Sequence, residues 1–308
     1  MSTSSEETGR ALRVYQVDAF TTTKFTGNPA AVVSDADALS SDEMQAIARE
    51  MNCSETAFLL SPIADDHDIW VRYFTPTSEV PICGHATIAA HYVRATEAGA
   101  FTARRVRAKT GAGILPVDIE PVGRDFEVTM TQGALEFAPP LRERQRAELL
   151  QALGLDSDEL DPRCPPQIVS TGHSEVLVGI RTVADVDQLK PDLAALQSLS
   201  IALGCNGYFA FALTPESSAL TYGRMFAPAI GINEDPVTGN ANGPLGAYLV
   251  EHHLVGAIDG RFEFTARQGD ALGRPGSMHV AVTVADAHPT SVAVTGRAVI
   301  VFSTELIL

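Results

Sequence analysis

The sequence predicts an α+β protein of two pseudo-symmetric halves, each an antiparallel-rich sheet wrapped around a central helix. Three observations predict this fold: an internal repeat, short alternating segments typical of strands, and one almost entirely apolar helical segment in each half. The length of 308 residues agrees with two halves, because it exceeds the length of one ordinary domain and suits two domains of typical size.

The repeat is visible when the first half of the chain is aligned with the second. Four pairs of segments match in the same order, with offsets of 145, 153, 152 and 155 residues. They pair 26–33 with 171–178, 58–62 with 211–215, 72–76 with 224–228, and 81–86 with 236–241. One such match arises easily by chance, but four in register indicate a duplication.

The first half begins with patterns of strands and one helix. A helix is expected from Ser41, as its N-cap, to about Met51. A turn at Gly27-Asn28-Pro29 separates the first two strands. The alternation of apolar and polar residues, or a short apolar run, predicts strands at 14–20, 31–33 and 70–74.

Each half then carries one helical segment directly after a glycine turn. The first covers 86–93 and the second covers 243–250, where Pro244 is acceptable in the first turn of a helix. Both segments are apolar on almost all sides, which is typical of buried helices. We therefore expect one central helix in each half.

The second half has one strand pattern more than a simple division allows. The patterns lie at 263–265, 278–282, 291–294 and 297–302. We expect the last of them to return to the first half. The predicted halves are residues 11–125, completed by 297–308, and residues 126–296.

Composition excludes several classes of function. A net charge of −16 and a pI near 4.8 argue against nucleic acid and anionic membranes as partners. No apolar run approaches the roughly 18–20 residues that span a bilayer, and residues 1–10 have the composition of a polar tail. The four cysteines lack zinc-ligand spacing, and a Rossmann motif and a P-loop are missing. The sequence thus predicts a cytoplasmic protein that needs no cofactor.

The two glycine turns are the first candidate for a binding site. Cys83-Gly84-His85 and Thr238-Gly239-Asn240 each precede a predicted buried helix. Free backbone N–H groups and the helix dipole make a helix N-terminus a binding site for a carboxylate. The alternative is that the glycines only allow tight turns. The duplication favours a shared cleft, because ligand sites are frequent between similar domains.

Four polar residues near these turns are candidates for acid–base chemistry. Glu55 precedes an apolar strand, although a surface carboxylate at a helix–strand junction is the commoner fate of a glutamate. His85 and Asp235 suit proton transfer, or else ordinary capping of a helix and a loop. Cys83 is either a thiol base at a helix N-terminus or a buried structural cysteine.

The longest motifs resemble the PhzF-like phenazine-biosynthesis family. They lie at 25–29, 54–56, 75–87 and 234–243, and the similarity extends from about Val14 to Val301. The resemblance implies a fold like that of diaminopimelate epimerase, with the site between the halves, a homodimer, and an isomerase that moves a proton on a small carboxylate without metal or organic cofactor. It implies Glu55 as the proton-shuttling carboxylate, with His85 and Asp235 assisting. The residues implied in holding the substrate are Asn28, Gly84, Ala86, Gly239, Asn240 and Ala241.

Two departures from related enzymes bear on the reaction. Epimerases of this fold use one cysteine from each half, whereas the repeat places Cys83 opposite Thr238. Asn240 stands where the phenazine enzyme has a serine, so the substrate is not assigned. The cysteine pairing favours a proton-moving isomerase over an epimerase or racemase acting at the carbon α to a carboxylate. The joint presence of Glu55, His85 and Asp235 disfavours a non-catalytic protein that binds small acids.

Overall fold

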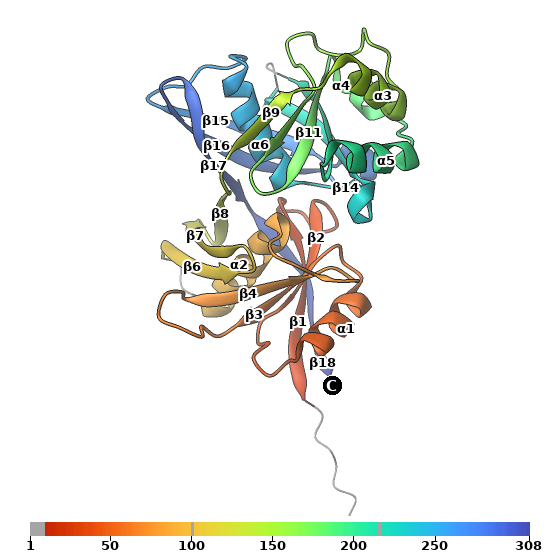
Figure 1. Ribbon diagram of the computed structural model, residues 1–308. Helices are drawn as coiled ribbons and strands as arrows, with labels where there is room; N and C mark the ends of the chain where they lie inside the picture. The colour runs from red at the N-terminus through yellow and green to blue at the C-terminus, as the bar shows by residue number, and fades with distance from the viewer. Residues whose placement is uncertain (1–9, 100–101, 215–216) are drawn as a thin grey trace, which may run out of the picture.

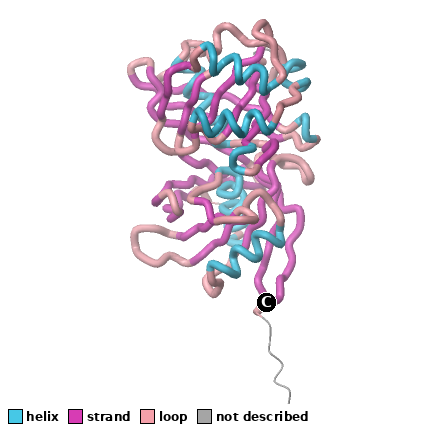
Figure 2. Tube along the Cα trace, turned by 45° about the vertical axis from the view of Figure 1, so that its right-hand side comes forward, coloured by secondary structure: helices cyan, strands magenta, loops and turns pink. Residues whose placement is uncertain are grey.

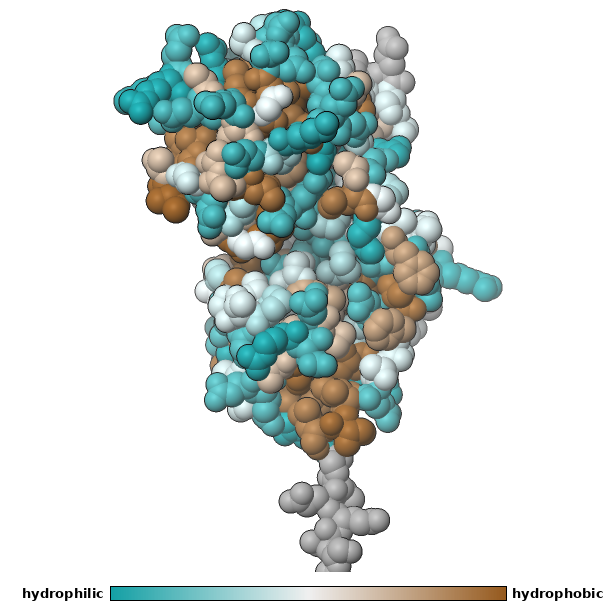
Figure 3. Space-filling model, turned by 90° about the vertical axis from the view of Figure 1, so that its right-hand side faces the viewer, coloured by the Kyte–Doolittle hydropathy of each residue, from teal (hydrophilic) through white to brown (hydrophobic). Residues whose placement is uncertain are grey.

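Two lobes are stacked along one axis and meet at a narrow waist (Figures 1 and 3). The computed structural model describes residues 10–99, 102–214 and 217–308. The polar tail expected at 1–10 therefore lies outside the described residues except for Arg10, as does Pro215 of the repeat.

The lower lobe in Figure 1 contains most of the first half. It is a mixed sheet around one long helix, with a second helix on its outer side. Its elements are β1 (Ala11–Ala19), β2 (Asn28–Val33), α1 (Ser41–Met51), β3 (Thr56–Leu60), β4 (Ile69–Phe74), β5 (Glu79–Val80), α2 (Gly84–Ala98), β6 (Arg104–Thr110), β7 (Gly113–Val122) and β8 (Asp125–Thr131).

The upper lobe repeats this plan with additions. Its first elements are β9 (Glu136–Pro140), α3 (Glu143–Leu153), β10 (Gln167–Ser170), β11 (Ser174–Ile180), α4 (Val183–Gln188), α5 (Leu193–Leu203), β12 (Gly207–Leu213) and β13 (Thr221–Ala227). They are followed by β14 (Ile232–Asp235), α6 (Gly239–Glu251), β15 (Arg261–Gln268), β16 (Gly276–Ala285), β17 (His288–Gly296) and β18 (Ala298–Ile307). Helices α3, α4 and α5 were not expected from the sequence. They bury a separate apolar cluster on the outer face of the sheet.

Strand β18 leaves the upper lobe and pairs antiparallel with β1, so the chain ends in the first half. Strand β8 pairs with β7 on one side and with β17 of the other lobe on the other. Most strand pairs are antiparallel, and β2–β3, β4–β6, β11–β12 and β13–β15 are parallel. The division at residues 125 and 126 stays a prediction.

Strand register reproduces the internal repeat. Thr56 lies between Ala31 and Phe74 in the first half. In the second half, Tyr208 lies between Val176 and Phe226. These equivalent positions differ by 145 and 152 residues, which are offsets of the sequence alignment. The same three-strand unit is therefore present twice.

Two details of the helices correct the sequence predictions. The N-cap of α1 is Ser40 rather than Ser41, because Ser40 and Glu43 form a reciprocal capping box. Helix α6 begins at Gly239, so Pro244 is its sixth residue and lies inside the helix instead of in its first turn. Proline has no N–H to donate, so the carbonyl of Asn240 loses its usual helical partner.

Helices α2 and α6 are buried along most of their length, as their apolar sequences predict. Figure 2 shows them inside the lobes with strands around them. Gly246 allows the close packing of α6, because a Cβ there would lie 2.9 Å from the side chains of Val280 and Val282. One apolar core includes residues of both halves. Among the described residues, no helix combines the length and apolar character needed to cross a membrane.

Candidate functional site

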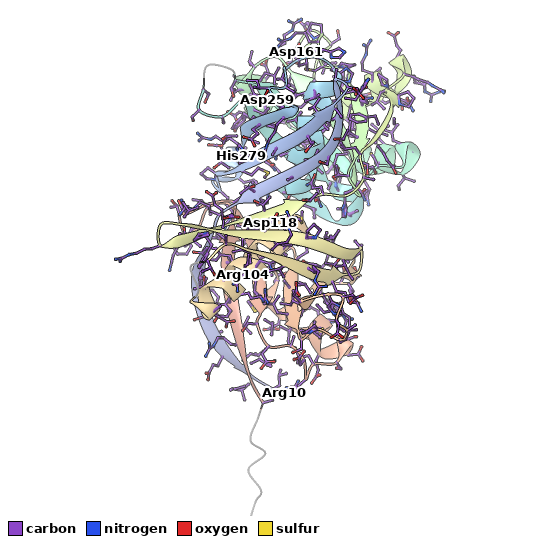
Figure 4. All side chains as sticks on the ribbon, turned by 90° about the vertical axis from the view of Figure 1, so that its left-hand side faces the viewer. Arg10, Arg104, Asp118, Asp161, Asp259 and His279 are labelled. Carbon is purple, nitrogen blue, oxygen red and sulfur yellow. The ribbon has the colours of Figure 1, made fainter. Side chains whose placement is uncertain are left out.

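Two cavities lie between the halves. The larger, of about 920 Å³, is lined by polar residues that include His279, labelled in Figure 4. Its described lining contains none of the predicted site residues. The smaller, of about 80 Å³, is lined by six of them: Glu55, Gly84, His85, Asp235, Gly239 and Asn240. We assign the site to the smaller cavity, because buried titratable groups converge there.

Helices α2 and α6 both begin at this cavity. Their N-cap residues are Cys83 and Thr238, and neither side chain caps its helix. A Cβ placed on Gly84 would lie 3.5 Å from Oδ1 of Asn240, so the two helix starts face each other at contact distance. The first N–H groups of a helix have no intrahelical acceptor and lie at the positive end of its dipole. The paired helix starts therefore suit a bound carboxylate.

Glu55 enters the cavity from the link between α1 and β3. Its Oε2 lies 3.3 Å from Nε2 of His85, and Oγ of Ser54 lies 3.2 Å from the same nitrogen. The side chain of Glu55 is 12% exposed, and its Oε2 is buried without a hydrogen-bond partner among the described residues. This carboxylate thus has an oxygen free to meet a substrate.

Asp235 is held by side chains from both halves. Its Oδ1 accepts a hydrogen bond of 2.8 Å from Nδ2 of Asn28, and its Oδ2 accepts one from the hydroxyl of Thr238. Asn28 belongs to β2 of the first half, whereas Thr238 precedes α6 of the second. The carboxyl of Asp235 therefore links the halves inside the site.

A second link fixes the turn that carries Asn28. Gly27 has φ +65°, and a Cβ there would lie 2.3 Å from the carbonyl oxygen of Ala19, so only glycine fits. Arg274 of the second half donates to Oδ1 of Asp18 at 2.6 Å and to the carbonyl of Gly27 at 2.9 Å. Asp18 is 1% exposed, so this ion pair is largely sequestered.

Burial shifts the protonation equilibria of the site toward neutral forms. It raises the pKa of Glu55 and of Asp235, and it lowers the pKa of His85. The charges of His85 and Asp235 oppose these shifts without cancelling them. The Glu55–His85 contact is consequently no permanent ion pair. A carboxyl with a raised pKa beside an imidazole is suited to general acid–base catalysis near neutrality.

Cys83 is buried at the start of α2, with Sγ 3.4 Å from Nδ1 of His85. Burial, and secondly the negative charge of Glu55, raise the pKa of its thiol well above the ordinary value. Ligand atoms of Glu55, Cys83 and His85 lie within 4.8 Å of one another, so within the described part of the chain these three residues could hold a metal ion. That the chain needs no cofactor stays a prediction.

Two further titratable residues line the cavity and were missed as candidates from the sequence. Nδ1 of His173 lies 3.4 Å from Nδ2 of Asn240, and Glu175 is 3% exposed. The sequence contains a signal for each of these two residues. The repeat places His173 at the position of Asn28, and Glu175 stands in an apolar strand, which is the context that selected Glu55.

Three residues predicted to hold a substrate are not among those that line the cavity: Asn28, Ala86 and Ala241. The amide of Asn28 is engaged by Asp235 and by the carbonyl of Val237. Ala86 and Ala241 are the third residues of their helices, and the N–H of Ala241 donates to the carbonyl of Thr238 at 3.3 Å. Their part in substrate binding stays a prediction.

Comparison with known proteins places the chain in a family. The family described as phenazine biosynthesis-like protein matches residues 17–304. An uncharacterized isomerase of Clostridium acetobutylicum is 53% identical over 300 residues, 97% of this chain and 99% of the relative. The trans-2,3-dihydro-3-hydroxyanthranilate isomerase of Pseudomonas chlororaphis is 37% identical over 85% of this chain and 87% of its own length.

Solved structures agree with these sequence matches. The PhzF-family phenazine biosynthesis protein of Bacillus anthracis is 31% identical, with a TM-score of 0.86 over 97% of this chain and 100% of that chain. A hydroxyproline epimerase from Agrobacterium vitis, 13% identical, shares the fold with a TM-score of 0.64 over 97% and 92%. The predicted two-half fold is thus confirmed, and the chain belongs to the PhzF-like, phenazine biosynthesis-like family of isomerases.

Proposed function

We propose that this isomerase moves a proton on a small carboxylated substrate, with Glu55 as the general base and acid. One observation carries the proposal. The carboxylate of Glu55 has a buried, unpartnered oxygen beside His85, in a cavity onto which two helix N-termini open. A base at that position meets a substrate whose carboxylate is held by the helix starts.

The proposed reaction begins when a substrate carboxylate binds the N–H groups at Gly84 and Gly239. Glu55 then takes a proton from carbon, and the electron pair is delocalised into the rest of the substrate. Positive dipole ends near the carboxylate stabilise the negative charge that develops there. Glu55 or a neighbouring acid returns a proton at a second carbon. Asp235, fixed by Asn28 and Thr238, maintains the arrangement of the two halves.

The size of the cavity limits the substrate class. About 80 Å³ admits a small molecule only, and Ile82, Met225 and Ile232 give it an apolar wall. Because a relative 37% identical to this chain is named for trans-2,3-dihydro-3-hydroxyanthranilate, that compound is the first probe. Small amino and hydroxy acids are the next.

Glu55→Gln tests the proposal. The amide keeps the shape of the side chain but cannot accept the proton, so turnover should fall by about 100- to 10,000-fold. Ligand-induced thermal stabilisation should persist, because the helix starts are unchanged. Glu50→Gln, at an exposed position on α1, is the matched control. Turnover near the wild-type rate in Glu55→Gln, with the control also active, would show that Glu55 is not the base.

A further inference from the structure

Glu175 is a buried carboxyl that the proposed reaction leaves without a task. It is the second residue of β11, and it lines the same cavity as Glu55. Its Oε2 is buried and has no hydrogen-bond partner among the described residues. A buried carboxyl of this kind is costly to the fold, so its presence in the cavity calls for a chemical explanation.

The internal repeat relates the positions of Glu175 and Glu55, which line the same cavity from different halves. In the first half, Glu55 directly precedes β3, and its carbonyl accepts a hydrogen bond of 3.3 Å from the N–H of Ala31 on β2. In the second half, Glu175 is paired with Gly207 on neighbouring parallel strands. The repeat offsets make Ala30 equivalent to Glu175, and Glu55 equivalent to Gly207. Each half therefore contributes one glutamate to this part of its sheet: the first half from the residue before β3, and the second half from β11, the counterpart of β2.

Burial and the charges around the cavity together favour the protonated form of this second glutamate. Glu55, Glu175 and Asp235 all line the cavity, and none of its described lining residues is a lysine or arginine. Three ionised carboxylates lining a cavity of about 80 Å³ would repel one another. Asp235 accepts two hydrogen bonds, which favour its ionised form, whereas Oε2 of Glu175 accepts none. Burial, and secondly the charge of Asp235, raise the pKa of Glu175 well above its ordinary value.

We propose that Glu175 is a second catalytic residue, a carboxylic acid of the second half that delivers a proton to the substrate, whereas Glu55 of the first half removes one. This inference rests on the proposed function for Glu55 as the base, and it assigns the part of the acid to Glu175. The C–H bond of the substrate breaks, its proton goes to Glu55, and its electron pair stays on the substrate. The O–H bond of Glu175 then breaks, and its proton forms the new C–H bond. Product leaves with Glu55 protonated and Glu175 ionised, and exchange with water restores the starting forms.

The test compares proton exchange with isomerisation in the same sample. Wild type, Glu175→Gln and Glu55→Gln are incubated in deuterated water with trans-2,3-dihydro-3-hydroxyanthranilate, L-proline and trans-4-hydroxy-L-proline, and are followed by NMR. In Glu175→Gln, isomerisation should fall by about a hundredfold or more, while Glu55 still exchanges the reacting hydrogen for deuterium. Glu55→Gln should lose both reactions.

The outcomes separate this inference from the proposed function. If Glu175→Gln isomerises a probe within about threefold of the wild-type rate, or loses exchange together with isomerisation, Glu175 is not the second acid. If Glu55→Gln keeps both reactions, the proposed function fails instead. In wild type, a product that retains the substrate's own hydrogen at the new C–H position would also overturn the inference, whatever the folding of the variant.

A measurement without substrate covers the case in which none of the probes reacts. Infrared difference spectra at neutral pH should lose one protonated-carboxyl C=O band on Glu175→Gln. Glu50→Gln, whose carboxyl is exposed, should leave that band unchanged. A spectrum in which Glu175→Gln removes only an ionised carboxylate would overturn the inference.

Discussion

Replacing Cys83 by serine should leave most of the activity intact. A free thiol has a pKa of about 8.5, so only ~3% of it is thiolate at pH 7. Burial of Cys83 and the negative charge of Glu55 beside it reduce that fraction further. Serine can donate to or accept from His85 as the thiol does. We therefore expect kcat/KM to stay within about fivefold of wild type, whereas loss of a general base would cost about 100- to 10,000-fold.

The assay is a steady-state determination of kcat and KM for wild type, Cys83→Ser and Cys83→Ala on the best substrate found. A fivefold change corresponds to about 1 kcal/mol in activation free energy, and a thousandfold change to about 4 kcal/mol, so the two results are easily told apart. Alkylation of wild type should inhibit through the bulk of the added group. A thousandfold loss in Cys83→Ser would refute the argument and favour an epimerase with a thiol base.

Three more predictions concern the metal question, the link between the halves and the buried acid. Protein treated with a chelator should keep full activity; loss that is rescued by a divalent ion would mean that Glu55, Cys83 and His85 bind it. Arg274→Ala should cost about 3 kcal/mol of unfolding free energy, because the buried carboxylate of Asp18 loses its charged partner and keeps only the N–H of Phe25 as a donor among the described residues. Arg267→Ala, which breaks an exposed pair, should cost less than about 1 kcal/mol in the same urea titration, and equal losses would contradict this. The free energy of unfolding of Glu175→Gln should rise relative to that of wild type as the pH rises from about 5 to about 8. The reason is that a carboxyl whose pKa is raised on folding destabilises the folded wild type above its unfolded pKa. Parallel pH profiles of the two proteins would rule this out.

Much of the fold could be predicted because the duplication doubles every signal. The strand signal at 70–74 is weak by itself, but its match to 224–228 strengthens it. The structure has strands at both places, in the same register with their neighbours. The two turns that contain Gly84 and Gly239 could be found for the same reason. Helices α3 to α5 have no counterpart in the first half, so the repeat gave no information about them. The start of α6 was missed because Pro244 is typical of a first turn, and burial of the helix overrides that preference.

The candidate site was less predictable, because several of its contacts join residues distant in sequence. Glu55 and His85 were proposed together, and the structure brings them to 3.3 Å. The contact between Asn28 and Asp235 spans 207 positions and depends on how the halves dock. Glu175 was overlooked because a single acid in a strand is usually a solvent-facing residue. The burial of both faces of β11 in the structure shows that the side chain of Glu175 does not face solvent.

The two halves share what the backbone provides and differ in what the side chains provide. Both present a glycine at the start of a buried helix, and an N–H group binds a carboxylate whatever the side chain. In the repeat, however, Cys83 corresponds to Thr238, His85 to Asn240, and Glu55 to Gly207. A reaction that removes a proton at one carbon and adds one at another has no need of identical groups on its two sides. The asymmetry of the side chains therefore suits a proton-moving isomerase, while the symmetric helix starts need only to hold the substrate still.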